Sequence, residues 1–203
     1  MNTSIPARSK HNFEVPEGTQ EVFRQLLDAI ANPGKSVDIS NQVFKFESNG
    51  LYLGLALTLL DNESSFYFDG STDLGEEIRF LSGAAEVPLE KADFVFLTIK
   101  DENVKANATN VFSRLKSGTH LDPHNSAMLF VAAGGDVEHS VNLKGPGIPP
   151  LGRETALSSL EMFWLRARDL QGFEYPCGVE LIFLREDNTI LAITRKAAVT
   201  WPT

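Results

Sequence analysis

Residues 179–193 read VELIFLREDNTILAI, and this stretch decides the fold class. Two apolar runs, at 179–184 and 189–193, flank the polar turn Glu186-Asp187-Asn188. Such runs around a short polar turn predict an antiparallel β-hairpin. Any sheet that contains this hairpin must contain some antiparallel pairing.

A long helix is predicted just before the hairpin, over residues 158–171, and Gly172 ends it. Its polar members Arg166, Arg168 and Asp169 are expected off the buried face. The expected apolar face consists of Leu160, Phe163, Trp164, Ala167 and Leu170. Phe163 and Trp164 are therefore interpreted as core residues.

Helices and strands alternate through the rest of the chain. Helices are predicted from Gly18 to a stop at Asn32-Pro33-Gly34, over 51–60, from a cap at Asp73 to Gly83, and from Ala108 to Gly118. Strands are predicted at 36–39, 65–68 and 94–99. A second hairpin is predicted from 127–132 and 137–143 around Gly134-Gly135-Asp136.

This alternation predicts an α/β fold with a mixed β-sheet flanked by helices. Residues 16–203 are expected to form a single domain, and residues 1–15 an N-terminal arm. The chain has 203 residues and 42% hydrophobic residues, enough for one sizeable core. No repeats or low-complexity tracts are visible.

Composition excludes several classes of function. Eighteen Lys and Arg against 27 Asp and Glu give a net charge of −9, which disfavours nucleic acid and anionic membrane as partners. The single cysteine, Cys177, excludes an intramolecular disulfide and an iron–sulfur cluster held within one chain. No signal peptide or membrane-spanning run is seen, so a cytoplasmic location is expected.

Two glycine motifs resemble nucleotide-binding loops only in part. Residues 29–36 approach a phosphate-binding loop, but a helix leads into them and Pro33 removes an amide donor, so a helix stop is the favoured interpretation. Gly145-Pro146-Gly147-Ile148 lacks the third glycine and the immediate helix of a dinucleotide site. This loop is interpreted as a rigid turn, with anion binding by its amides as the alternative.

Three further features carry chemistry in principle. His120-x-Asp122-x-His124 has metal-ligand residues, but Pro123 prevents a shared helical face, so solvated loop histidines are expected and no metal is predicted. Cys177 lacks a nearby histidine base and is interpreted as a small buried side chain. Arg195-Lys196 follows the last predicted strand, where either phosphate contact or a solvated strand exit is consistent with the sequence.

One family resemblance covers residues 13–199. Motifs of the PhnH family are similar to the following segments in the same order: Gln20-x-x-Phe23-Arg24-x-Leu26-Leu27-x-Ala29-Ile30-x-x-Pro33-Gly34, Leu59-Leu60-Asp61, Ser117-Gly118-Thr119 with Pro123, Leu143-x-Gly145-Pro146-Gly147-Ile148, Tyr175-Pro176-x-Gly178-Val179-Glu180, and Ala192-Ile193-Thr194-Arg195. The sequence departs from the family pattern at Glu180, where the family usually has Asp. In the ending Thr194-Arg195-Lys196-Ala197, only the Arg is retained.

The resemblance implies a fold similar to that of pyridoxal-phosphate-dependent transferases, without that cofactor. It implies a subunit of the carbon–phosphorus lyase core complex with PhnG, PhnI and PhnJ proteins, and a homodimer when isolated. That complex transfers alkylphosphonate to the ribose of ATP, which gives ribose 1-phosphonate 5-triphosphate.

We therefore expect an accessory or scaffold subunit that requires no cofactor. No catalytic residues are assigned, and Gly145, Gly147 and Arg195 are the expected phosphate contacts. One alternative is a self-sufficient enzyme with a site near His120, His124 and Cys177. Another is a purely structural dimer module.

Overall fold

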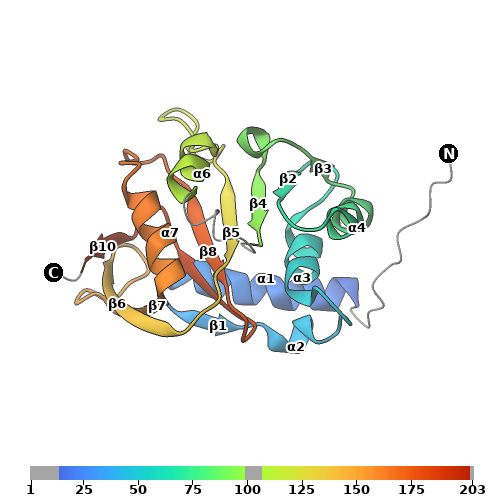
Figure 1. Cartoon of the computed structure of the whole chain (residues 1–203), viewed down its shortest axis with the longest axis horizontal. Helices are drawn as coiled ribbons and strands as arrows, with labels where there is room; N and C mark the ends of the chain where they lie inside the picture. Colours follow the sequence, from blue (N-terminus) through green and yellow to red (C-terminus); the bar gives the residue numbers. More distant parts are fainter. Residues whose placement is uncertain (1–13, 99–106, 202–203) are drawn as a thin grey trace.

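The computed structural model describes residues 14–98 and 107–201. Helices cover a mixed β-sheet within these ranges, which confirms the predicted α/β class (Figure 1). Most of the predicted arm, residues 1–13, lies outside the described residues, as does Ile99 of one predicted strand. None of the described helices is long and apolar enough to cross a membrane.

The main sheet has seven strands, and one of them runs opposite to the other six. In spatial order the strands are β1 (Ser36–Asp38), β9 (Thr189–Ile193), β8 (Glu180–Leu184), β5 (Met128–Ala132), β4 (Phe94–Leu97), β2 (Ser65–Phe68) and β3 (Ala85–Glu86). The antiparallel pairs are β8 with β9 and β9 with β1. The predicted hairpin is thus confirmed, with Leu181 opposite Ile193 and Leu184 opposite Ile190.

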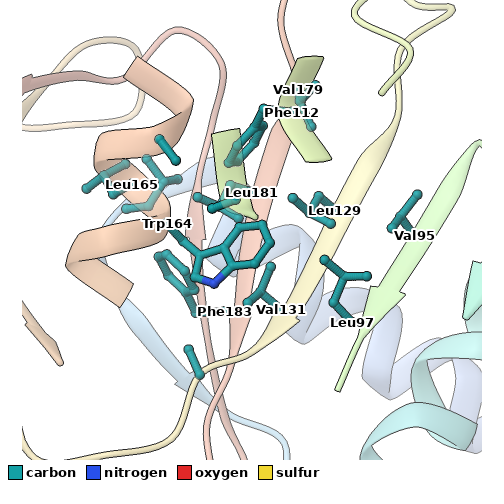
Figure 2. Close-up of a cluster of buried hydrophobic side chains, with 14 of the residues drawn as sticks. Val95, Leu97, Phe112, Leu129, Val131, Trp164, Leu165, Val179, Leu181 and Phe183 are labelled. Carbon is teal, nitrogen blue, oxygen red and sulfur yellow. The ribbon is translucent and has the colours of Figure 1, made fainter. Parts of the chain in front are cut away.

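Both faces of this sheet are buried, because helices pack against each of them. On one face lie α1 (Val15–Ala31), the short α2 (Ser40–Val43), α3 (Gly50–Leu59) and α4 (Thr72–Ser82). The other face is covered by α6 (Ala108–Arg114) and α7 (Ser159–Asp169), and a one-turn helix η1 (Leu89–Lys91) precedes β4. Alternate residues of each strand point to opposite faces, so Phe96 and Phe130 stack at 4.8 Å on the α1 face. Leu129 and Val131 join Trp164 on the α7 face (Figure 2).

The hairpin predicted from 127–132 and 137–143 is wrong. β5 is paired on both edges by parallel neighbours, β4 and β8, so no edge remains for the next strand. The chain instead leaves the sheet and forms β6 (Val137–Lys144), which pairs with β7 (Arg153–Ser158) and β10 (Ala198–Thr200) in a separate three-stranded sheet. Strands β7 and β10 were not predicted from the sequence.

The predicted long helix is confirmed as α7, but its polar and apolar faces are only partly as expected. Ser158 and Glu161 form a reciprocal capping box at its start. Trp164 is fully buried, whereas Phe163 and Leu170 are 39% and 76% exposed. Arg168, expected in solvent, is buried. The buried face is therefore rotated from the predicted one.

The other predicted helices are present as α1, α3, α4 and α6. The cap of α4 is Ser71 rather than Asp73, since the Ser71 side chain accepts the Leu74 amide hydrogen. Ser71 has the extended backbone of an N-cap, and Asp73 falls in the first turn, where a negative charge favours the helix dipole.

Candidate functional site

Segments far apart in the sequence meet at one cavity of about 550 Å³. It lies at the amino ends of β5 and β8, next to the carboxyl end of α1. Its lining comes from the end of α1, residues 123–124, 146–147 and 175–176, Glu180, and residues 194–196. Each of these segments belongs to, or directly adjoins, a motif quoted above.

The glycine loop after β6 is fixed by close backbone approach. Gly147 has φ +76°, and a Cβ there would lie 2.2 Å from the carbonyl oxygen of Ala31. Gly145 has φ +145°, and a Cβ there would lie 2.7 Å from the carbonyl oxygen of Lys196. Any other residue would therefore clash with the neighbouring backbone and adopt a strained conformation. Gly147 lines the cavity, whereas Gly145 sits behind the lining against the Lys196–Ala197 backbone.

Arg195 lines the cavity and forms an ion pair with Glu180. Its Nε donates to Glu180 Oε1 at 2.6 Å, and its backbone N–H donates to Glu180 Oε2 at 3.0 Å. Its Nη1 donates to the carbonyl oxygen of Pro123 at 2.7 Å. Both side chains of the pair are only 18% exposed. Arg195 is thus held rigidly, and its Nη2 makes no hydrogen bond within the part of the chain that the structure describes.

Lys196 lies on the same turn but makes a different contact. Its ammonium group lies 5.0 Å from the centre of the Tyr175 ring, which is itself largely exposed. This distance is typical of a cation–π contact. Residues 14–98 and 107–201 provide no carboxylate partner for Lys196, which is exposed.

A buried arginine on α7 braces the turn that carries Arg195 and Lys196. Arg168 donates from Nη1 to the carbonyl oxygen of Thr194 at 3.1 Å and from Nη2 to that of Ala197 at 3.0 Å. Asp169 balances its charge with a contact of 2.9 Å. A smaller cavity, of about 210 Å³, is lined by both Arg168 and Arg195. The turn is therefore held from its inner side by a side chain that the sequence pattern predicts in solvent.

Residues 29–36 form the end of α1 and the entry to β1, which confirms the predicted helix stop. Arg153 Nη1 donates to the carbonyl oxygens of Asn32 and Pro33, at 2.6 and 2.9 Å. These contacts satisfy carbonyl groups that the end of a helix leaves without partners.

The histidines and the cysteine of the alternative enzyme site are dispersed. His124 lines the cavity and lies 3.0 Å from Asp122, whereas His120 contacts Glu174 at 3.8 Å outside the lining. Cys177 is half-buried, and its amide donates to the Glu174 carbonyl oxygen. Among the described residues, no three His, Cys, Asp or Glu side chains are arranged to hold a metal ion.

A second cavity, of about 340 Å³, lies at the opposite end of the sheet. It follows the carboxyl end of β2 and the start of α4, the usual position for ligands in parallel α/β sheets. Two carboxylates, Glu76 and Glu86, line it with Arg79. In the same region, burial, with a smaller contribution from the charge of Asp69, raises the pKa of Tyr52 to about 12. None of the family motifs quoted above converges on this cavity, so the 550 Å³ cavity is the stronger candidate.

The first cavity offers fixed donors, one cation–π pair and apolar walls. Its described lining does not pair a nucleophile with a base at hydrogen-bonding distance, which a covalent mechanism requires. Glu180, Lys196 and Arg168 were not predicted from the sequence to belong to one arrangement. The position of Glu180 beside Arg195 could have been predicted from the sequence. If the pairing of the predicted hairpin is extended by one step, Glu180 lies opposite residue 194, next to Arg195.

Comparison with known families gives one match. A sequence model of the family described as "Bacterial phosphonate metabolism protein (PhnH)" matches residues 12–200. No curated protein matches the chain.

Proposed function

This chain belongs to the PhnH family of bacterial phosphonate metabolism proteins, and from that membership we propose that it is an accessory subunit of the carbon–phosphorus lyase core complex. In this proposal it assembles with PhnG, PhnI and PhnJ proteins in the cytoplasm. It supports the step that transfers alkylphosphonate to the ribose of ATP. The isolated chain is a homodimer, formed by its single domain at residues 16–203, with a fold related to pyridoxal-phosphate-dependent transferases but without that cofactor.

The convergence of the family motifs on one cavity carries this proposal. Gly147 and Arg195 are the proposed contacts for a phosphate or phosphonate group, and Gly145 holds the loop that presents Gly147. The cavity has fixed donors but lacks a paired nucleophile and base among its described lining, which favours a supporting role over independent catalysis.

Reconstitution tests the proposal directly. The four chains are expressed together with an affinity tag on the PhnI protein, and phosphonate-dependent consumption of ATP is measured with and without this chain. We expect co-purification, and loss of the transfer step when the chain is omitted. Failure to co-purify, or full transfer without the chain, would refute the proposal.

A single substitution tests whether Arg195 contacts the substrate. In the assembled complex, Arg195→Ala should lower the rate of transfer while the variant still co-purifies, because it removes a fixed donor from the cavity wall. Lys35→Ala is a suitable control, since Lys35 forms an exposed pair with Asp28 outside the cavity lining. Equal rates for the two variants would argue against Arg195 as a substrate contact.

A further inference from the structure

The charged side chains of the 550 Å³ cavity leave only a small positive excess. Arg195 and Lys196 supply two positive charges, and Glu180 supplies one negative charge within the same lining. The Glu180 carboxylate uses both oxygens on Arg195 and is mostly shielded from water, so the positive charge of Arg195 is largely neutralised. Lys196 remains as the one cation of the described lining without a carboxylate partner.

Other groups around the cavity do not strengthen its positive charge. His124 is exposed, and its Nδ1 lies 3.0 Å from an oxygen of the Asp122 carboxylate, so a negative charge lies beside the ring. The carboxyl end of α1 also adjoins the cavity through Ala31, and the end of a helix carries partial negative charge. The chain as a whole is at −9.

Much of the remaining wall is apolar. Ile30, Ala31, Pro123, Pro146 and Pro176 line the cavity together with Tyr175, and none of these five offers a side-chain donor. A cavity of this size with few polar groups is typical of small-molecule sites. The wall therefore suits a ligand with an apolar part beside its charged group.

We infer that this cavity takes a single phosphonate or phosphate group on a small apolar body, that it excludes a polyphosphate chain, and that Glu180 sets this limit. The inference rests on the proposed function and restricts it: the triphosphate of ATP must then be held by another chain of the complex. One tetrahedral anion is matched by Lys196 and by Nη2 of Arg195, which has no hydrogen-bond partner among the described residues. A second and third phosphate would lie beside the Glu180 carboxylate and the end of α1, where like charges repel.

Calorimetric titration of the isolated, full-length chain tests the inference with defined probes. Ethylphosphonate, inorganic phosphate and tripolyphosphate are titrated into the wild-type protein and into Glu180→Gln. Glutamine keeps the size of the side chain and one accepting oxygen, so it retains one of the two hydrogen bonds from Arg195 while the charge is removed. Glu174→Gln is the matched control, because Glu174 is exposed and outside the cavity lining.

Wild-type protein should bind ethylphosphonate more tightly than inorganic phosphate, because only the former has an apolar part, and should bind tripolyphosphate least. Glu180→Gln should tighten tripolyphosphate binding by about tenfold, the effect of removing one unit charge at about 6 Å in a partly shielded site. Ethylphosphonate binding should tighten by a smaller factor, about threefold, because it carries fewer negative charges than tripolyphosphate. Lys196→Met should weaken ethylphosphonate binding by at least about fivefold, and this exposed position tolerates substitution without unfolding.

Three results would overturn the inference: tighter binding of tripolyphosphate than of ethylphosphonate by the wild type, no gain in tripolyphosphate affinity in Glu180→Gln, or no binding of ethylphosphonate by the wild type. Equal binding of ethylphosphonate and inorganic phosphate would also contradict it, because it would mean that the apolar wall makes no contact. Each of these results is independent of co-purification with PhnG, PhnI and PhnJ proteins, so the accessory-subunit proposal can stand when this inference fails.

Discussion

Individual glycines in this protein are required by the approach of backbone from another segment. At Gly147 the positive φ and the carbonyl oxygen of Ala31 act together, since a Cβ would lie 2.2 Å from that oxygen. Gly172 also has a positive φ, of +60°, but a Cβ there would meet no atom within 4 Å. The two positions therefore separate the effect of backbone strain from that of a steric clash.

Gly147→Ala should lower the free energy of unfolding by about 3 kcal/mol, because strain and clash add. Gly172→Ala should lower it by about 1 kcal/mol, because only the strain remains. Urea denaturation of both variants beside the wild type measures the two values. Equal losses in the two variants would show that the backbone near Ala31 moves away from the added Cβ at no cost in free energy.

The special residues of the cavity could be predicted from sequence, but their pairing could not. Gly147 and Arg195 stand out as a loop glycine and a basic residue after a strand. The Glu180–Arg195 pair depends on the exact register of β8 and β9, and Lys196 depends on where Tyr175 lies. The periodicity of side chains within one segment predicts neither contact, because each contact joins two segments that are separate in the sequence.

Elements with a strong local pattern were predicted well, and elements defined by their partners were not. The β8–β9 hairpin, α1 and α3 follow directly from apolar periodicity and turn residues. β5 and β6 have the same local signals as a hairpin, but β4 and β8 occupy both edges of β5. Competition between strands for an edge is a property of the whole sheet, so the sequence of β5 and β6 alone could not reveal it.

Helix α7 contributes a buried arginine where its sequence pattern predicts an exposed one. Arg168→Met should lower the free energy of unfolding by about 3 kcal/mol, because the carbonyl groups of Thr194 and Ala197 and the Asp169 carboxylate lose their partner. Urea denaturation measures this loss.

Arg166→Met is the matched control on the same helix. Arg166 is exposed and lies 5.1 Å from the centre of the Trp201 ring, so its removal should lower the free energy of unfolding by less than about 1 kcal/mol. A similar loss in both variants would mean that Arg168 does not brace the turn after β9.

At the scale of the whole molecule, a polar network ties together the amino ends of three parallel strands. Asp93, just before β4, accepts hydrogen bonds from Ser65 at the start of β2 and from Lys116 on the segment leading to β5. Partial burial alone would raise the pKa of Asp93, but the hydrogen bonds from Lys116 and Ser65 outweigh it and hold this pKa below its usual value of 3.8. The network therefore stabilises the folded chain only while Asp93 is ionised.

The lowered pKa fixes the sign of the pH dependence. The stabilisation from Asp93 is fully present above about pH 4, where an unfolded aspartate is ionised, and is lost as the pH falls through the lower folded pKa. Asp93→Asn should thus unfold at a lower urea concentration than the wild type at pH 7, and this difference should shrink progressively below pH 4. Asp136 is an exposed loop residue without an ion pair in the described ranges. Asp136→Asn should therefore unfold at the same urea concentration as the wild type, both at pH 7 and at pH 3. A difference for Asp93→Asn that is constant from pH 7 to pH 3 would contradict the account.

The cavity described above draws on Ile30 at one extreme and Lys196 at the other, with four further segments between them. Contacts of such long sequence separation form late, once the strands that position them have paired. A molecule with any of these segments out of place has no cavity to offer, even when most of its core is already built. A ligand or partner that binds the cavity would therefore bind only copies of the chain in which all of these segments are in place.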